Sequence, residues 1–182
     1  MLSFYYFRAQ NSHFLSNQQS TIVMQASHIR KGAEKDLPQV HKLIYELAVF
    51  ERAPEEMTLT LEQLQLDFAA ESPAFHFFVA ENDGKITGMA LYFFTYSTWK
   101  GKTLYLEDLV VQENWRCKGI GSLLFEAVLN EAHRTGARRM AWQVLEWNNP
   151  AIEFYKKYKA ELDAEWINGR LREQQISQLA TH

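Results

Sequence analysis

The stretch from Lys102 to Ala127 constrains the fold most, because an apolar strand there runs through a glycine-containing turn directly into a helix. Residues 102–111, KTLYLEDLVV, have the long apolar content of a strand buried on both faces. Residues 114–127, NWRCKGIGSLLFEA, place an arginine, a lysine and two glycines ahead of an amphipathic segment. The chain is therefore predicted to be an α/β protein with helices packed on a sheet.

The remaining segments predict a mixed sheet with helices on its faces. Asp83-Gly84, between two β-rich runs, is the strongest hairpin signal in the chain. Asp36 is predicted as the N-cap of one helix, and Thr60 with Gln63 forms a capping-box pattern at the start of a second. The expected elements are a strand (27–32), two helices (34–51 and from 60), a hairpin (75–97), a strand (102–111), a helix (121–136), a strand (137–147), a helix (148–160, with Asn149 as N-cap and Pro150 at N1), and a last strand or hairpin (165–176) around Asn168-Gly169.

Length and composition indicate one buried domain. The chain has 182 residues, of which 47% are hydrophobic. We expect a single domain over residues 28–176, a flexible N-terminal extension over residues 1–27 and a C-terminal tail over residues 177–182. The apolar run at residues 2–7 is too short to span a membrane, so no membrane partner is expected.

Charge and cysteine usage narrow the partners and the compartment. The formal net charge of −3 provides no basic face for nucleic acid, and a small, possibly cationic partner fits better. Cys117 is the single cysteine and cannot form an intramolecular disulfide, which favours a reducing compartment. We therefore expect a cytoplasmic protein.

The turn at residues 116–121 has the features of an anion site. Free N–H groups and the positive end of a helix converge beside Arg116 and Lys118, although the glycines could simply make a tight turn. A dinucleotide fingerprint would need a third glycine where Leu124 stands, and a P-loop would need a Gly-Lys-Ser/Thr ending that is absent. The pattern that remains is R-x-x-G-x-G, which suits a pyrophosphate held without a metal.

This R-x-x-G-x-G stretch resembles the coenzyme A loop of the GNAT acetyltransferase superfamily. The order of elements from about residue 29 to about residue 172 matches the superfamily, and IYELAVFE, YFFTYSTWKGKTLYLEDLVV, GIGS and EWNNPAIEFY are similar to its diamine acetyltransferase group. That group includes the spermidine/spermine and thialysine N-acetyltransferases. The resemblance implies a mostly antiparallel central sheet with a V-shaped opening between two central parallel strands, acetyl-CoA as co-substrate, and a homodimer.

The resemblance also implies which residues contact the coenzyme. The strand before the loop would offer its backbone to the pantetheine arm, and the loop would offer its amides to the pyrophosphate. Cys117 stands where a glycine is frequent in the family, but backbone contacts tolerate that change. The implied residues are Leu109, Val110, Val111, Arg116, Cys117, Lys118, Gly119, Ile120, Gly121, Ser122, Asn148, Asn149, Pro150 and Ala151.

The implied reaction is direct attack of a primary amine on the thioester. An alkylamine has a pKa of about 10.4, so a proton must leave before the attack. Glu107 matches the carboxylate of the group that removes it through a water, and Asp108 would point to the opposite face if the strand is regular. Tyr155 matches the general acid, because a phenol with a pKa near 10 remains able to donate its proton at neutral pH, and Phe154 is the better core candidate.

Acidic and aromatic side chains are the expected determinants of a cationic substrate. Ser97 stands where the polyamine branch carries an aspartate, which favours a short amine such as thialysine over a long polyamine. The expected substrate-binding residues are Phe50, Glu51, Trp99, Glu107 and Asp108, with Glu55, Trp142 and Glu146 as weaker candidates.

Two other functions remain open from the sequence. The chain could acetylate a true polyamine or a protein amine, or it could be a non-catalytic module that binds acyl-CoA. The presence of both Glu107 and Tyr155 disfavours the module, because a binder needs neither a base nor an acid.

Overall fold

A five-stranded sheet with the order β1-β2-β3-β4-β5 forms the centre of the protein. The computed structural model describes residues 27–180. The strands are β1 (His28–Lys31), β2 (His76–Asn82), β3 (Lys85–Ser97), β4 (Gly101–Val111) and β5 (Arg139–Ala141), and the helices are α2 (Leu37–Phe50), α3 (Leu61–Ala69), α4 (Ile120–Arg134), α5 (Asn149–Lys157) and α6 (Glu173–Leu179). Short 3-10 turns lie at η1 (Glu34–Asp36), η2 (Pro54–Glu56) and η3 (Glu113–Trp115).

The first four strands pair antiparallel, and β4 and β5 pair parallel. The predicted hairpin is confirmed, since Asp83 and Gly84 both have the positive φ (48° and 75°) of a tight two-residue turn. The mixed, mostly antiparallel sheet with helices on its faces is confirmed as well.

The parallel pair opens into a V. Only Thr103–Tyr105 pair with Arg139–Ala141, and β4 then continues to Val111 with β3 as its one partner among the described strands. The strand predicted over residues 137–147 is therefore much shorter than expected, because the chain beyond Ala141 leaves β4. Since β5 is the last described strand, the V lies at the edge of this sheet rather than between two central strands.

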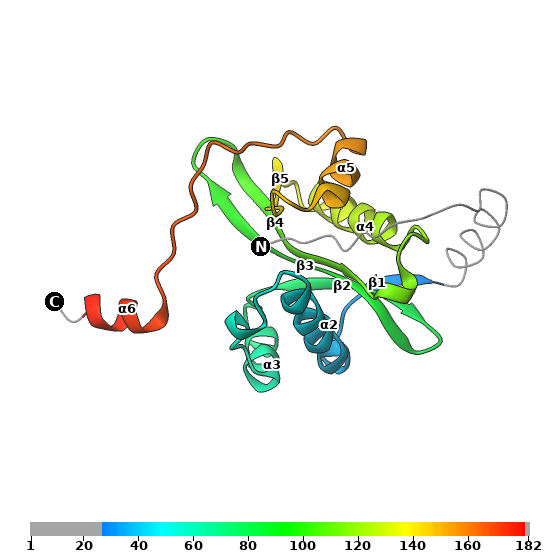
Figure 1. The fold of residues 1–182 in the computed structure, drawn as a ribbon, viewed down its shortest axis with the longest axis horizontal. Coiled ribbons are helices and arrows are strands. Elements are labelled where there is room, and N and C mark those ends of the chain that lie inside the picture. Colours follow the sequence, from blue (N-terminus) through cyan, green and yellow to red (C-terminus); the bar gives the residue numbers. More distant parts are fainter. Residues whose placement is uncertain (1–26, 181–182) are drawn as a thin grey trace.

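Helices cover both faces of the sheet, with α2 and α3 on one face and α4 and α5 on the other (Figure 1). Each helical layer forms its own apolar core with the strands. The α4 and α5 side contains Tyr92, Leu104, Leu106, Leu109, Phe125 and Tyr155, and the α2 and α3 side contains Leu37, Val40, Leu43, Val79, Met89 and Val110.

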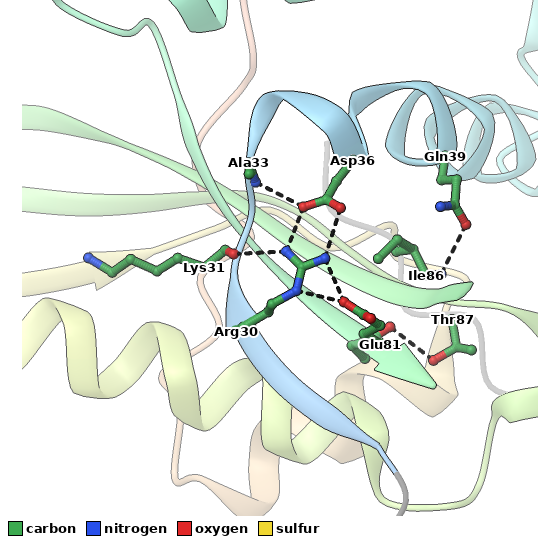
Figure 2. Close-up of polar contacts among 9 residues, drawn as sticks. Arg30, Lys31, Ala33, Asp36, Gln39, Glu81, Ile86 and Thr87 are labelled. Carbon is green, nitrogen blue, oxygen red and sulfur yellow. Dashed lines mark hydrogen bonds and ion pairs between the residues drawn. The ribbon is translucent and has the colours of Figure 1, made fainter. Parts of the chain in front are cut away.

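A network around Arg30 joins β1 to η1, directly before α2, and to β2 (Figure 2). The guanidinium binds both carboxylate oxygens of Asp36 at 2.6 and 2.8 Å, and its Nε donates to Glu81 at 2.7 Å. The Asp36 carboxylate also accepts from the Ala33 amide at 2.9 Å. The hydrogen bonds from Arg30 hold the pKa of Asp36 below its usual value and raise that of Arg30.

Two predicted helix caps differ in the structure. Asp36 occupies the N-cap of α2, but its side chain faces Arg30 and Ala33 instead of the first helical turn. At α5 the cap is Asn148 rather than Asn149, because the Asn148 side chain accepts from the Ala151 amide at 3.3 Å. Thr60 caps α3 through the Gln63 amide, as predicted.

The last strand predicted at residues 165–176 is absent from the described chain. Residues 160–172 have no regular secondary structure, and α6 follows them, extending away from the sheet (Figure 1). A strand needs a hydrogen-bonded neighbour, and this segment is exposed along its length. The extension predicted over residues 1–27 lies outside the described residues apart from Ser27.

Candidate active site

A β-bulge in β4 sets the direction of the two acidic residues. Leu91 pairs with Asp108 while Tyr92 pairs with Leu106, so Glu107 is an extra residue in the ladder. Leu106 and Leu109 both pack on the α4 side, which places Glu107 and Asp108 together on the α2 side. The strand is thus not regular here, and the two carboxylates do not face opposite sides as a regular strand would require.

Glu51 joins this acidic pair from the end of α2. It is the C-cap residue of α2, and its Oε1 is buried. Burial, followed by the negative charges of Glu107 and Glu51, raises the pKa of the Asp108 carboxyl to about 7. The site therefore gathers three carboxyl groups, of which one changes its charge near neutral pH.

Tyr155 approaches the same site from α5. Its side chain is fully buried, and its ring lies 4.7 Å from the ring of Trp142 and 5.6 Å from that of Phe125, between ring centroids. Burial, and then the negative charge of Asp108, raises the pKa of the Tyr155 phenol above its ordinary value. The phenol thus stays protonated and lies within the electrostatic reach of Asp108. Phe154 is also buried, as predicted.

The turn between β4 and α4 has an irregular backbone. Cys117 and Gly119 have positive φ values of 58° and 84°, and Gly119 is the N-cap of α4. A glycine N-cap has no side chain to accept from the first-turn amides, so these amides point toward the turn. The left-handed φ also explains why a glycine suits position 117, since a residue with a Cβ is strained there.

Two side chains of this turn are held by local contacts. Arg116 donates from Nε to the Val111 carbonyl at 2.9 Å, so that backbone acceptor is engaged. The Lys118 ammonium lies 5.1 Å from the centroid of the Trp115 ring. Both cations therefore remain beside the start of α4.

Most of the other predicted coenzyme residues lie in the core, so a ligand would meet their backbone. The side chains of Leu109, Val110, Val111, Ile120 and Ala151 are buried. Asn148 is buried too and caps α5, while Asn149 and Pro150 begin that helix. Gly121 and Ser122 belong to the first turn of α4.

A groove of about 400 Å³ opens beside this turn. It is lined by Tyr45, Glu46 and Val49 of α2 and by residues 112–116, which end in Arg116. The groove connects the outer face of α2 with the start of the predicted pyrophosphate turn.

The structure does not bring Trp99 to the acidic cluster of its own chain. Trp99 lies at the tip of the β3–β4 hairpin and is 83% exposed. The part of β4 from Gly101 to Glu107 is about 20 Å long, and it separates the hairpin tip with Trp99 from the acidic cluster. In the same turn, the Ser97 hydroxyl accepts from the Lys100 amide at 3.2 Å. Of the weaker candidates, Glu55 and Glu146 are exposed.

Two residues near the site, Trp147 and Arg52, were not predicted from the sequence. Trp147 packs its ring 5.4 Å from that of Phe50, and the Arg52 guanidinium carbon lies 5.4 Å from the Trp147 ring centroid. These contacts join the end of α2 to the start of α5. A tryptophan directly before the Asn148 cap was the available signal, but only the fold shows what it touches.

No metal cluster is found in the described part of the chain, where no three His, Cys, Asp or Glu side chains are arranged to hold an ion. Among residues 27–180, none of the helices is both long enough and apolar enough to cross a membrane.

Comparison with known proteins identifies the family. Residues 37–159 match the model of the acetyltransferase (GNAT) family. The match spans more than half of the chain, and the chain belongs to this family, whose members use acetyl-CoA.

Several curated relatives are similar over most of their length. The thialysine N-epsilon-acetyltransferase of Mus musculus is 33% identical over 168 residues, which are 86% of this chain and 99% of the relative. That of Bos taurus is 36% identical over 141 residues, covering 73% and 83%. The L-ornithine N5-acetyltransferase of Arabidopsis thaliana is 29% identical over 191 residues, covering 80% and 84%. These relatives and the family make the protein an amine N-acetyltransferase.

Solved structures support the fold. A crystal structure of an aminoglycoside acetyltransferase from an uncultured soil metagenomic sample aligns with a TM-score of 0.70 at 24% identity. The alignment covers 82% of this chain and 99% of that one.

Proposed function

We propose that the enzyme transfers acetyl from acetyl-CoA to a terminal amine of a small cationic molecule, either a thialysine-like amino acid or a diamine. The observation that carries the proposal is the grouping of Glu51 and Glu107 around Asp108, whose charge also acts on the Tyr155 phenol. A cluster of carboxylates attracts an ammonium group and can accept its proton. The names of the curated relatives support this class of substrate.

The donor would bind along the open edge of β4 and at the start of α4. Past Tyr105, the β4 backbone has no described neighbour on the side of β5, which suits an added strand-like ligand. Leu109 and Val110 would offer backbone groups there, while Val111 already accepts from Arg116. The amides of residues 117–122 and the cation of Lys118 would receive the pyrophosphate. Residues 148–151 would flank the coenzyme at α5.

The acids would prepare the acceptor, and Tyr155 would assist departure of the thiolate. The amine must lose a proton before it attacks the acetyl carbonyl carbon. Glu107 is our candidate base, acting through a water, and Asp108 holds the ammonium and can share its proton. As the C–S bond breaks, the Tyr155 phenol donates a proton or a hydrogen bond to the sulfur. Its raised pKa keeps the proton available.

A long polyamine or a protein amine is the alternative acceptor. Ser97 provides no negative charge at the β3–β4 turn, and its hydroxyl is engaged with the Lys100 amide. A distant second ammonium would therefore gain less there than it would from an aspartate. The proposed substrate contacts remain Phe50, Glu51 and Trp99. The Trp99 side chain could contribute to the active site of a second copy of the chain.

We further propose a cytoplasmic homodimer without nucleic-acid or membrane partners, its domain spanning residues 28–176 between an N-terminal extension and a short tail. The exposed segment after α5 supports the dimer, since Trp166 and Ile167 are 74% and 97% exposed. Apolar side chains so exposed indicate a surface that a partner can cover. The single cysteine supports a reducing compartment.

A thiol-release assay tests the proposed function. Purified enzyme with acetyl-CoA is given thialysine, lysine, ornithine, short diamines, spermidine and spermine. We expect the highest kcat/KM for the short acceptors and clearly lower values for the two polyamines. Equal rates with all amines, or no release above the rate without an amine, would refute the proposal.

A further inference from the structure

We propose that Arg52 binds the carboxylate of the acceptor, so that the enzyme prefers amino acids with a terminal amine over diamines of the same length. The inference rests on the proposed function and names the group that the site recognises besides the amine. It assigns a role in specificity to a residue that lies next to the acidic cluster but carries the opposite charge.

The backbone holds Arg52 in a defined place. It follows Glu51 at the end of α2, and its amide donates to the Val49 carbonyl at 3.1 Å. Its φ of 62° is left-handed, and the following Ala53 amide donates to the Ala48 carbonyl at 3.0 Å. These bonds fix the chain where it turns away from the helix, and they direct the side chain toward the start of α5.

The Trp147 ring holds the guanidinium but leaves its donors available. The Arg52 guanidinium carbon lies 5.4 Å from the Trp147 ring centroid, and Phe50 packs on the same indole. A guanidinium over an aromatic ring uses its face, while its N–H groups project from the edge and match a carboxylate in two-point geometry. Among residues 27–180, Arg52 forms no ion pair, and its side chain is exposed.

The positions of the acidic and basic side chains suit an acceptor that carries both an ammonium group and a carboxylate. Glu51 Oε1 is buried, and its charge acts on Asp108, so the acids lie inward. Arg52 follows Glu51 in the chain, and its side chain is exposed to solvent. An amino acid with a terminal amine can place its ammonium among the acids and its carboxylate against Arg52. A diamine would instead bring a second ammonium toward the guanidinium, which repels it.

A matched pair of acceptors tests this role. The pair is thialysine and the diamine that its decarboxylation leaves, and kcat/KM is measured for both with wild type, Arg52→Met and Arg52→Lys. We expect Arg52→Met to lower kcat/KM for thialysine on the order of 10–100-fold and to leave the diamine unchanged or improved. Arg52→Lys should retain part of the preference, because it keeps the charge but not the planar fork.

Lys159→Met serves as the control, since Lys159 is also an exposed cation with a positive φ (56°) just after a helix. It should leave both acceptors unchanged. An equal loss for both acceptors in Arg52→Met, or no change for either, would overturn the role of Arg52. Absence of transfer to any amine in the wild type would instead refute the proposed function, and the inference with it.

Discussion

At the scale of single residues, the structure changes the relation between Glu107 and Asp108. A regular strand would separate their side chains, but the bulge turns both toward α2. Asp108 then lies near Glu51, Glu107 and Tyr155, and its carboxyl becomes the group with a pKa of about 7. The site thus contains a carboxyl that can hold or release a proton at physiological pH.

Replacement of Asp108 by asparagine should raise stability while lowering activity. In the unfolded chain this carboxyl ionises near its ordinary pKa of 3.8, but in the folded chain near 7. The folded state therefore binds the extra proton between these values, and the free energy of unfolding falls as the pH rises from about 4 to 7. Asp108→Asn should be more stable than wild type by roughly 1–3 kcal/mol at pH 8 and equal to it at pH 3.5.

Urea unfolding at the two pH values measures this difference, with the exposed Asp163→Asn as control. The same Asp108→Asn variant should lose most of its kcat/KM at pH 7.5. A variant that is less stable than wild type at pH 8, or equally stable at both pH values, would contradict the burial of a charged carboxyl at this position.

Removal of the Tyr155 hydroxyl should separate catalysis from binding. Tyr155→Phe keeps the ring contacts with Phe125 and Trp142 but loses the proton donor. We expect kcat to fall on the order of 100-fold or more, with coenzyme A affinity by calorimetry within a few-fold of wild type. Tyr96→Phe, which removes the hydroxyl of an exposed tyrosine on β3, should keep its turnover. Unchanged turnover in Tyr155→Phe would show that this phenol is not the general acid.

At the scale of elements, the sequence predicted those turns, caps and strands that depend on residues close together in the chain. The Asp83-Gly84 turn, the Thr60 cap and the strand leading into α4 each depend on neighbouring residues, and all three are present. The short β5 and the missing last strand depend on pairing with distant segments, which a one-dimensional pattern does not contain. The acidic cluster could not be predicted from the pattern either. A one-residue bulge reverses the direction of side chains without leaving a clear signal in the sequence.

The Arg30 network is predicted to hold the first strand and the first helix against the sheet. Arg30→Met removes the cation that pairs with the Asp36 side chain, which is 4% exposed, and leaves this buried charge with only the Ala33 amide as hydrogen-bond donor. We expect a loss of about 3–5 kcal/mol in the free energy of unfolding. The double variant Arg30→Met with Asp36→Leu should recover a large part of that loss. Additive losses in urea unfolding would instead indicate that the pair is not coupled.

At the scale of the whole molecule, the described sheet has a short strand, β5, at one edge. The sheet ends at a strand of three residues, and the segment beyond α5 meets the rest of the protein through bonds such as Arg172–Glu56 at 2.7 Å and Gln143–Asn168 at 2.5 Å. In the homodimer that we propose, a second copy of the chain covers the exposed Trp166 and Ile167 of this segment.

The proposed dimer predicts a change of mass on substitution. Light scattering after gel filtration should give twice the mass of the chain for wild type. Ile167→Glu should shift the enzyme toward the monomer, because it places a charge within the proposed contact, while Glu165→Gln should remain dimeric. A monomeric wild type would contradict the dimer but would leave the chemistry of the acidic cluster untouched.

The central claim is that the acids of α2 and β4 present a terminal amine for direct acetylation. Tandem mass spectrometry of the product from thialysine and acetyl-CoA locates the acetyl group most directly. We expect acetyl on the side-chain nitrogen and an unmodified α-amine. The Glu107→Gln, Asp108→Asn double variant should form no product. Acetyl on the α-amine, or full product formation without both carboxylates, would contradict the central claim.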